Sequence, residues 1–371
     1  MDLADSWYLI DGLGPVDSPA LVIYLERIQY NIEQMVRIAG SPGRLMPHVK
    51  TYKMSQIVKM QMDNGIHRFK CATIAEAEML GLAQAEMALL AYQPSEAKIN
   101  RLIELVHHYP GTRYATLIDN LTTAEIISGI LEKKGDILDV YIDINNGNNR
   151  TGIPPDKVGA LFRTSRNLKG IRVRGLHIYD GHIRLQDLHE RKKACDQAFK
   201  PVRELVQALQ NELDWDPEII AGGSPTFAIH AERENVVCSP GTTLFWDAGY
   251  AASFPDLPFL PAAAVITRIV SEPGNRLLCL DLGHKAIASE NPIENRVRFL
   301  NAQGLVPLGH SEEHLVVENT KDAPLKTGDI LYGIPYHICP TTALYNEVMV
   351  VLGHKIVDHW EVQARTRRIN Y

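Results

Sequence analysis

Residues 113–144, RYATLIDNLTTAEIISGILEKKGDILDVYIDI, contain two short apolar runs separated by a longer amphipathic stretch. The runs RYATLI (113–118) and ILDVYIDI (137–144) have the β-branched and aromatic content of buried strands. The stretch 121–134 follows Asp119-Asn120, a pair typical of helix starts. The segment therefore predicts a strand, a helix and a second strand that belongs to the same parallel sheet.

The same alternation extends outward from this unit, from about Arg44 to Thr243. Further strands are predicted near 45–50, 68–72, 87–91, 173–179, 217–221 and 236–238, and further helices at 54–64, 74–84, 95–108, 155–168 and 187–213, with a short and weak unit near 225–233. Eight strands separated mainly by helices across about 200 residues predict a (β/α)8 TIM barrel. An open doubly wound sheet is the competing interpretation, but no GxGxxG motif follows an early strand.

The pattern changes after about Pro261, where β-rich runs are separated by turn residues. The runs are AAAVITRIV (262–270), RLLCLDLG (276–283), RVRFL (296–300), HLVVEN (314–319), DILYGI (329–334), NEVMVVLG (346–353) and IVDHWEVQA (356–364). They predict a separate β-rich domain, which the early strand ALVIYL (20–25) could join. We therefore expect an α/β protein with a barrel at 26–250 and a β-rich domain built from 1–25 plus 251–371.

The composition narrows the class of protein. The chain has 371 residues, of which 45% are hydrophobic and 22% charged, and its formal net charge is −6. These values exclude a disordered or fibrous chain, and the acidic balance predicts no binding to nucleic acid or anionic lipid. Five cysteines indicate no disulfide framework and favour a reducing compartment. Without a signal peptide at Met1–Ile10 or an apolar run of about 18 residues, we expect a cytoplasmic protein with no membrane segment.

Glycines and hydroxyl residues follow the last two predicted strands of the barrel. Gly222-Gly223-Ser224 comes after the seventh strand and Gly241-Thr242 after the eighth. Barrels frequently bind phosphate at this place through backbone N–H groups and hydroxyls. Each motif could be an ordinary turn, but the two together favour a phosphate, which could belong to a cofactor.

Lys50 ends the first predicted strand, in the segment HVKTYK. A lysine here points either to solvent or into the barrel mouth, where a desolvated amine beside other cations becomes nucleophilic and can form a Schiff base. Together with the predicted phosphate site and Arg150, Lys50 favours pyridoxal 5′-phosphate (PLP), a phosphorylated aldehyde, as the cofactor.

The β-rich region contains the pair His337 and Cys339, separated by one residue. On a strand, two such side chains project to the same face and could bind one metal ion, and imidazole with thiolate suits zinc. Such pairs also occur without any metal, and this one supplies only two ligands. Asp247 is one carboxylate that could complete the site. The remaining cysteines are interpreted as small buried hydrophobic residues, and the loose histidines His284, His310 and His314 as structural or surface residues.

These residues lie in segments that resemble the D-threonine aldolase / D-serine dehydratase family, which has the alanine-racemase-like fold of PLP enzymes. The segments are, in chain order, PHVKTYK (47–53), FKCATIAEAEML (69–80), NRTGI (149–153), GLHIYDGH (175–182), AGGSPTF (221–227), SPGTTLFWDAGY (239–250), GHSEEHL (309–315) and YHICPT (336–341). The resemblance implies a PLP-binding barrel, a C-terminal β domain and a homodimer.

The resemblance also implies roles for individual residues. It assigns Lys50 to the Schiff base, Tyr179 to the side of the pyridine ring and Arg150 to the ring hydroxyl. It assigns His182 to the neighbourhood of the substrate hydroxyl. The phosphate site would consist of Gly222, Gly223, Ser224, Gly241 and Thr242, and the divalent-metal pair of His337 and Cys339. The chain departs from the family pattern at Tyr52, where histidine is usual, and some aldolases have aspartate where Cys339 stands.

The expected reaction is a retro-aldol cleavage of a small D-3-hydroxy amino acid to glycine and an aldehyde. It would depend on PLP and on a divalent metal (Mn²⁺, Zn²⁺ or Mg²⁺), with Lys50 and His182 as the catalytic residues. The main competing reaction is β-elimination from D-serine or D-3-hydroxyaspartate, in which Lys50 would remove the Cα proton. Two further hypotheses are a non-catalytic PLP-binding protein and a barrel enzyme that acts on phosphorylated substrates without PLP.

Overall fold

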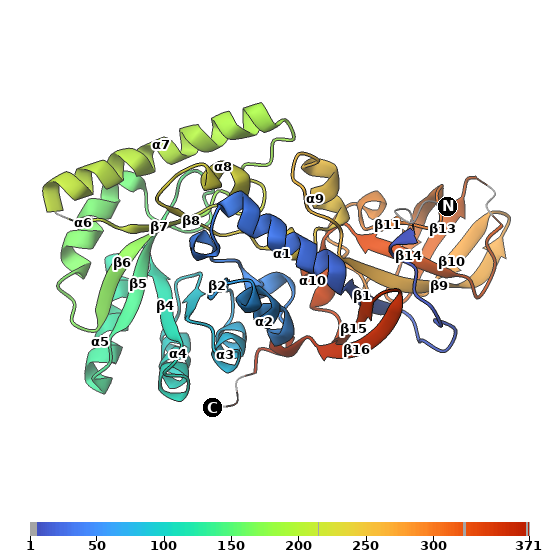
Figure 1. The fold of residues 1–371 in the computed structure, drawn as a ribbon, viewed down its shortest axis with the longest axis horizontal. Coiled ribbons are helices and arrows are strands. Elements are labelled where there is room, and N and C mark those ends of the chain that lie inside the picture. Colours follow the sequence, from blue (N-terminus) through green and yellow to red (C-terminus); the bar gives the residue numbers. More distant parts are fainter. Residues whose placement is uncertain (1–5, 214, 322–323, 369, 371) are drawn as a thin grey trace. The chain divides into compact units, whose positions relative to one another are not determined.

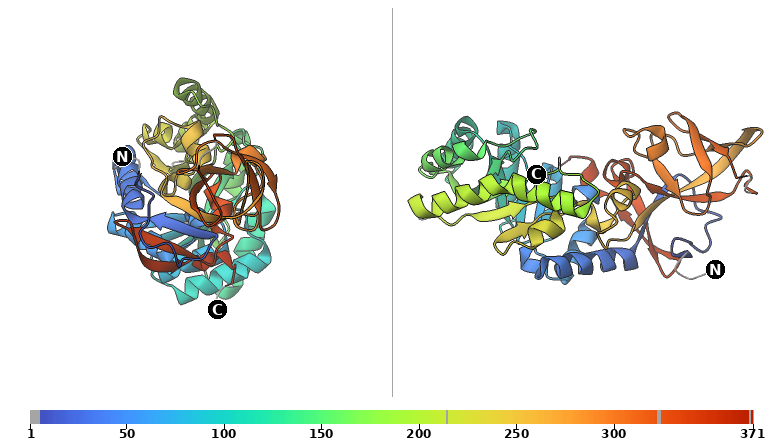
Figure 2. Two further views of the ribbon diagram at one scale, coloured as in Figure 1. Left: turned by 90° about the vertical axis from the view of Figure 1, so that its right-hand side faces the viewer. Right: turned by 90° about the horizontal axis from the view of Figure 1, so that it is seen from above.

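The computed structural model describes residues 6–213, 215–321, 324–368 and 370 (Figures 1 and 2). The chain forms two compact units. We call Met35–Gly241 with Thr366–Tyr371 the barrel unit, and Met1–Gln34 with Thr242–Arg365 the β unit. Helix α1 (Leu25–Ala39) runs from the second into the first. The division into domains at 26–250 and 1–25 plus 251–371 stays a prediction.

The barrel unit is built on a seven-stranded parallel sheet whose strands follow one another in sequence order. They are β2 (Arg68–Cys71), β3 (Met87–Leu90), β4 (Arg113–Ile118), β5 (Leu138–Ile144), β6 (Ile171–Ile178), β7 (Glu218–Ala221) and β8 (Val236–Cys238). Leu45 forms a parallel bridge to Cys238 on β8, and His48 forms one to Lys70 on β2. Residues 45–48 therefore join the two edges of the sheet. The predicted barrel is confirmed, with its first strand reduced to two isolated bridges.

The expected strand at 45–50 is wrong in its second half. Residues Val49–Thr51 form a 3-10 turn (η3) instead. His48 begins this turn, because its Nδ1 accepts a hydrogen bond from the Lys50 N–H at 3.2 Å. A side chain that takes over a backbone N–H in this way competes with sheet pairing. Lys50 thus lies on a turn above the barrel rather than on a strand.

Helices connect the strands of the barrel unit along its outer face (Figure 1). They are α2 (Ser55–Asp63), α3 (Ile74–Leu82), α4 (Glu96–His108), α5 (Leu121–Lys134), α6 (Pro155–Ser165), α7 (Leu188–Leu213) and α8 (Phe227–Ala231). The predicted helices are confirmed to within three residues at each end, and α8 falls in the weak unit near 225–233. Among the described residues, no helix is both long and apolar enough to cross a bilayer.

Apolar side chains fill the interior of the barrel. The cluster consists of Met46, Met87, Leu89, Ala115, Leu117, Tyr141 and Ile220, all at most 2% exposed. Apart from Met46, they lie on β3, β4, β5 and β7, at positions that face inward. The barrel is therefore a packed core, and polar chemistry is confined to its ends.

The β unit contains a nine-stranded sheet whose main path is β12-β13-β10-β9-β1-β15-β16, with β14 pairing β9 and β11. The strands are β1 (Ala20–Tyr24), β9 (Ala263–Gly274), β10 (Leu277–Leu280), β11 (Val297–Phe299), β12 (Leu305–His310), β13 (Leu315–Asn319), β14 (Ile330–Pro335), β15 (Glu347–Leu352) and β16 (Lys355–Glu361). β1 lies between β9 and β15, so the prediction that the early strand joins this sheet is confirmed. The strand missed from the sequence is β12, an edge strand that contains Pro307 and a bulge.

The expectation that His337 and Cys339 lie on a strand is wrong. β14 ends at Pro335, His337 is the N-cap residue of the short helix α10 (Ile338–Thr342), and Cys339 lies in its first turn. Pro340 explains the change, because proline has no N–H for a sheet yet fits the first turn of a helix.

Candidate active site

The Lys50 turn in the barrel unit packs against the loop that follows β8. The His48 N–H donates to the Pro240 carbonyl at 2.8 Å, and a Cβ added at Gly241 would lie 3.4 Å from the His48 Cβ. His48 is buried, and its pKa is lowered well below the usual value by desolvation and by the charges of Lys50 and Lys70. His48 is therefore a neutral residue that fixes the backbone of Lys50.

Two other predicted site segments contact the ring of Tyr179, which lies directly after β6. The guanidinium carbon of Arg150 lies 4.7 Å from the ring centroid, within the range of a cation–π contact. A Cβ at Gly223 would approach the Tyr179 Cε2 to 3.0 Å, so glycine allows this loop to lie directly on the ring. The structure thus brings Arg150, Tyr179 and the loop after β7 together.

The segment Gly222-Gly223-Ser224 after β7, here called the glycine-rich loop, was expected to offer free backbone N–H groups to a phosphate, but its glycine N–H groups are hydrogen-bonded. The Gly222 N–H continues the sheet by donating to the Ile178 carbonyl at 3.0 Å. The N–H groups of Gly223 and Gly241 donate to the hydroxyls of Thr226 and Ser224 at 3.3 and 3.2 Å. These two long bonds to side-chain hydroxyls are the contacts that a bound phosphate could replace. Thr242, the fifth predicted residue, begins a 3-10 turn (η4, Thr242–Leu244) in the β unit.

His182 is exposed and lies against the loop that carries Arg150. A Cβ added at Gly147 would lie 3.0 Å from the His182 Nε2. Gly147 has a φ of 119°, a left-handed conformation that favours glycine. The loops after β5 and β6 are therefore in contact through His182, at the end of the barrel that carries Tyr179.

Sequence reasoning missed a buried polar chain beneath these loops. The Lys70 Nζ lies 2.8 Å from the His177 Nε2, and the His177 Nδ1 lies 2.7 Å from an oxygen of Asp143. All three residues are at most 4% exposed. Burial, followed by the charge of Lys50, lowers the pKa of Lys70 to about 7. The available signal was a lysine, an aspartate and a histidine, each flanked by apolar residues within a predicted strand.

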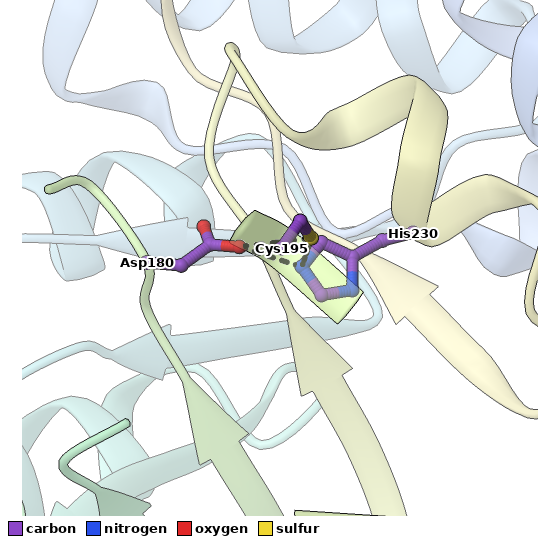
Figure 3. Close-up of side chains that lie close together, drawn as sticks. All are labelled: Asp180, Cys195 and His230. Atoms are coloured by element: carbon purple, nitrogen blue, oxygen red, sulfur yellow. Dashed lines mark hydrogen bonds and ion pairs between the residues drawn. The ribbon is translucent and has the colours of Figure 1, made fainter. Parts of the chain in front are cut away.

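A second buried group consists of Asp180, Cys195 and His230 (Figure 3). The His230 Nε2 lies 2.7 Å from Asp180, and the Cys195 Sγ lies 3.5 Å from the same nitrogen. Within the described part of the chain this is the one cluster of three possible metal-binding side chains whose ligand atoms all lie within 4.8 Å of one another. Arg233, however, donates to the His230 Nδ1 at 3.0 Å, and its charge beside the imidazole and the thiol opposes a second cation.

The Asp180 cluster supports the glycine-rich loop instead. Asp180 accepts a hydrogen bond from the Thr226 hydroxyl at 2.7 Å. The oxygen of the same hydroxyl accepts a hydrogen bond from the Gly223 N–H. A Cβ at Gly222, whose φ is 85°, would lie 2.7 Å from the His230 Cδ2. Burial raises the pKa of Cys195 to about 12, so its thiol is inert, as expected from the sequence.

In the β unit, the start of α10 brings His337 and Cys339 together. A hydrogen bond with Cys339, then the negative charge of Cys339 and a contact between the His337 Nδ1 and Glu290, raise the pKa of His337 to about 9. The Thr242 hydroxyl lies 3.7 Å from the Cys339 Sγ. A nitrogen, a sulfur and a carboxylate that could bind a metal therefore lie close together at the start of α10. Glu290 supplies the carboxylate, and the sequence analysis did not identify it.

Asp247, the suggested third metal ligand, binds backbone N–H groups at the starts of two short helices. Its two carboxylate oxygens accept hydrogen bonds from the backbone N–H groups of Tyr250, at 2.9 Å, and Ile338, at 3.0 Å. Asp247 is buried, and desolvation raises its pKa to about 6. It therefore anchors the first residue of α10, next to the His337 that it influences electrostatically.

The residues present fit the two groups that the sequence implies. For PLP, Lys50 offers an amine, glycines 222 and 223 let their loop lie directly against His230 and the Tyr179 ring, and the buried Ser239 Oγ has no hydrogen-bond partner among the described residues. For a divalent metal, the imidazole of His337 and the thiol of Cys339 form a donor set that suits zinc, with a carboxylate close by.

Two family models match the chain. Residues 23–248 match the model of the alanine racemase N-terminal domain, and residues 262–351 match a putative serine dehydratase domain. D-threonine aldolase of Arthrobacter sp. is 27% identical to this chain, and the match covers 96% of this chain and 94% of the relative. 3-Hydroxy-D-aspartate aldolase of Paracoccus denitrificans is 26% identical, with 94% of this chain and 92% of the relative covered. D-threo-3-hydroxyaspartate dehydratase of Delftia sp. is 25% identical, with 95% of this chain and 98% of the relative covered. All three relatives are lyases by name.

A solved structure of D-threonine aldolase from Filomicrobium marinum superimposes on the protein with a TM-score of 0.87 and 26% identity, and the match covers 96% of this chain and 97% of that one. The parallel barrel and the mixed β-sheet are therefore the two parts of the alanine-racemase-like fold. On the extent of the first family match, the chain belongs to the PLP-dependent family that is defined by the N-terminal domain of alanine racemase.

Proposed function

We propose that the protein is a D-threonine aldolase-like lyase that cleaves D-3-hydroxy amino acids to glycine and an aldehyde, with PLP and a divalent metal. The observation that carries this proposal is the likeness to a D-threonine aldolase structure along 96% of the chain. We further infer a homodimer in the cytoplasm, with small D-amino acids as substrates.

PLP, when bound, supplies an electron sink for the bond that breaks at Cα. The Lys50 Nζ would hold its aldehyde carbon. Tyr179 and Arg150 would orient the ring, since their side chains already contact one another. Gly222, Gly223, Ser224, Gly241 and Thr242 would bind the phosphate.

A divalent metal, when bound, lowers the pKa of a coordinated hydroxyl by Lewis-acid action. His337 and Cys339 would hold it through nitrogen and sulfur. His182 would take the proton of the substrate hydroxyl as a general base, because it is exposed at the barrel end that carries Tyr179. Loss of that proton drives formation of the aldehyde as the Cα–Cβ bond breaks.

The test is incubation of the PLP-loaded protein with D-threonine in the presence of Mn²⁺ or Zn²⁺, followed by assays for acetaldehyde and glycine. We expect both products in equal amounts, and no aldehyde from L-threonine. Lys50→Ala is the matched variant and should produce neither. The aldolase proposal is wrong if no D-3-hydroxy amino acid releases an aldehyde.

Dehydration is the second candidate, and the match of residues 262–351 to a putative serine dehydratase domain favours it. In that reaction Lys50 would remove the Cα proton and the metal would assist loss of the hydroxyl. D-serine would then give pyruvate and ammonia, which lactate dehydrogenase and NADH measure. Pyruvate from D-serine without aldehyde from D-threonine would replace the aldolase by the dehydratase.

A further inference from the structure

Glu290 is a carboxylate in the β unit that the proposed reaction does not use. Its side chain contacts the Nδ1 of His337, and the two side chains are 48% and 43% exposed, so that an ion from solvent can reach both. Within the described part of the chain, the Glu290 side chain has no other hydrogen-bond or ion-pair partner. An exposed pair of this kind adds little to stability, so its consequence has to be sought at the imidazole.

The backbone next to Glu290 is tied to the same turn that carries His337. The Ala288 N–H donates to the Thr341 hydroxyl, on α10, at 3.1 Å. The same hydroxyl donates to the His337 carbonyl at 2.9 Å. Thr341 therefore links the two segments through one oxygen atom and keeps the carboxylate beside the imidazole.

The contact decides which nitrogen of His337 is available to a metal. An ionised carboxylate accepts hydrogen bonds and cannot donate one, so the hydrogen between the two side chains belongs to the His337 Nδ1. The Nε2 is then the nitrogen whose lone pair a metal can take, and where the imidazole is charged the metal replaces the proton on that atom. Cys339, two residues further along α10, supplies the sulfur.

Glu290 lies beside the metal pair rather than in it. Glu290, His337 and Cys339 do not bring one ligand atom each within 4.8 Å of one another, because within the described residues only the Asp180 cluster does so. A histidine that binds a metal almost always donates its other ring N–H to a carboxylate, a backbone carbonyl or water, which fixes the ring and raises its basicity as a ligand. Together with a Cys339 thiolate, the carboxylate also supplies the second negative charge that balances a divalent cation.

We propose that Glu290 is a positioning residue for the metal pair: its carboxylate holds the His337 Nδ1–H, so that the His337 Nε2 and the Cys339 sulfur are the two atoms that bind a divalent metal. This inference rests on the proposed function in taking His337 and Cys339 as that pair. An exposed imidazole can otherwise rotate and offer either nitrogen, and Glu290 removes one of them from competition. On binding, the proton of the thiol, and that of a charged imidazole, pass to solvent.

Zinc titration of the PLP-loaded, chelator-treated protein by calorimetry tests the role of Glu290. We expect Glu290→Ala to weaken zinc binding about 10- to 100-fold. Glu290→Gln keeps an oxygen that accepts the Nδ1–H and should lose less. The matched control is Glu294→Ala, at an exposed glutamate on η5 (Ile293–Asn295), which should bind zinc as the wild type does. Zinc affinity that is unchanged in Glu290→Ala, or that falls equally in Glu290→Gln, overturns the role of the hydrogen bond.

Nitrogen NMR of the zinc-loaded protein with isotope-labelled histidines identifies the ligand atom without any assay of turnover. The signals of His337 are those missing from His337→Ala. We expect its Nδ1 to carry a hydrogen and its Nε2 to show the shift of a metal-bound nitrogen, and zinc on the Nδ1 overturns the inference. A wild type that binds no zinc contradicts the metal pair of the proposed function, whereas zinc binding that does not depend on Glu290 overturns this inference alone.

Discussion

Buried charged residues in the barrel unit are held in chains of hydrogen bonds. Asp180 accepts from Thr226 and His230, and Asp143 accepts from His177 and Gln93. Burial raises the pKa of a carboxyl group, and these hydrogen bonds and the neighbouring imidazoles outweigh it, so the pKa of each aspartate is lowered. Each chain is therefore stable only while all of its members are present.

Replacement of Asp180 tests this dependence. In Asp180→Asn the amide must place an N–H₂ group against a donor, either Thr226 or His230, in a site that is 1% exposed. We expect unfolding free energy in urea to fall by about 3–5 kcal/mol, as for other broken buried pairs. The control is Asp196→Asn, an exposed partner of Arg233, which should cost less than about 1 kcal/mol. Equal losses in the two variants would contradict the supporting role of Asp180.

The buried Lys70 predicts how stability depends on pH. Its pKa is about 7 in the folded protein and about 10.4 in an unfolded chain. Between these values the unfolded state binds more protons, so this residue makes unfolding free energy rise as pH increases from about 7 to about 10 and contributes no slope below that range. Urea titrations should show this extra rise in the wild type and in the exposed control Lys59→Met, but not in Lys70→Met. Parallel curves for all three would show that Lys70 does not titrate in this range.

At the residue scale, the sequence singles out candidate residues whose signal is local, and their roles stay predictions. Lys50, Gly222-Gly223-Ser224 and the pair His337 and Cys339 stand out because each is conspicuous within a few positions of chain. The chain Lys70–His177–Asp143 was missed because its members are separated by 107 and 34 positions, and only the barrel brings them together.

At the scale of single elements, α5 shows how end residues define a helix. The Asn120 side chain accepts a hydrogen bond from the Thr123 N–H at 2.8 Å, which satisfies one of the free donors of the first turn. Gly135 ends the helix with a φ of 77°, a left-handed conformation that favours glycine. Inside the helix, a Cβ added at Gly129 would meet no neighbouring atom within 4 Å.

Two substitutions in α5 should therefore change stability in opposite directions. Asn120→Ala removes the capping acceptor and should lower unfolding free energy by about 1 kcal/mol. Gly129→Ala adds a methyl group in open space and reduces the freedom of the unfolded chain, so it should raise unfolding free energy by about 0.5–1 kcal/mol. Thermal unfolding measures both, and Asn120→Asp, which keeps the acceptor, is the control. Stability lost on Gly129→Ala would show that this position is crowded.

Elements with a strong hydrophobic period were predicted well, whereas those decided by one side-chain contact were not. The helix at 121–134 and the strand at 113–118 match the observed bounds. The segment 45–50 reads as a strand, but the His48 imidazole takes the Lys50 N–H and turns the chain. The segment with His337 and Cys339 reads as the end of a strand, but Asp247, distant in sequence, accepts the N–H of Ile338 and helps to begin α10.

At the scale of the whole molecule, the β unit is built from both ends of the chain. β1 pairs with β9 in antiparallel and with β15 in parallel orientation, so a strand from the first part of the sequence lies in the middle of the sheet. Its side chains contribute to a core with residues from β9, β14 and β15. The sheet of the β unit therefore cannot be completed until the chain on both sides of the barrel unit is available.

The proposed centres are also divided between the units. Lys50, Tyr179 and the loop at Gly222 belong to the barrel unit, whereas His337 and Cys339 belong to the β unit, together with Thr242, the last of the predicted phosphate residues. Each centre is held by contacts within its own unit: Tyr179 by Arg150 and Gly223, and the metal pair by the start of α10. We therefore expect PLP and the metal each to bind without the other, although the proposed reaction would use both.

This independence gives the last prediction. His337→Ala and Cys339→Ala should each lower zinc affinity at least about 10-fold, the loss seen for even outer partners of metal sites, and abolish turnover while the visible absorbance with PLP stays at the wild-type level. Lys50→Ala should show the reverse, with no Schiff-base absorbance and unchanged zinc binding by calorimetry. Cys279→Ala, at a cysteine on β10 of the same unit, is the control and should change neither property. Loss of PLP absorbance in the His337 and Cys339 variants would mean that the cofactor site depends on the metal pair, and the two centres would then have to be treated as one.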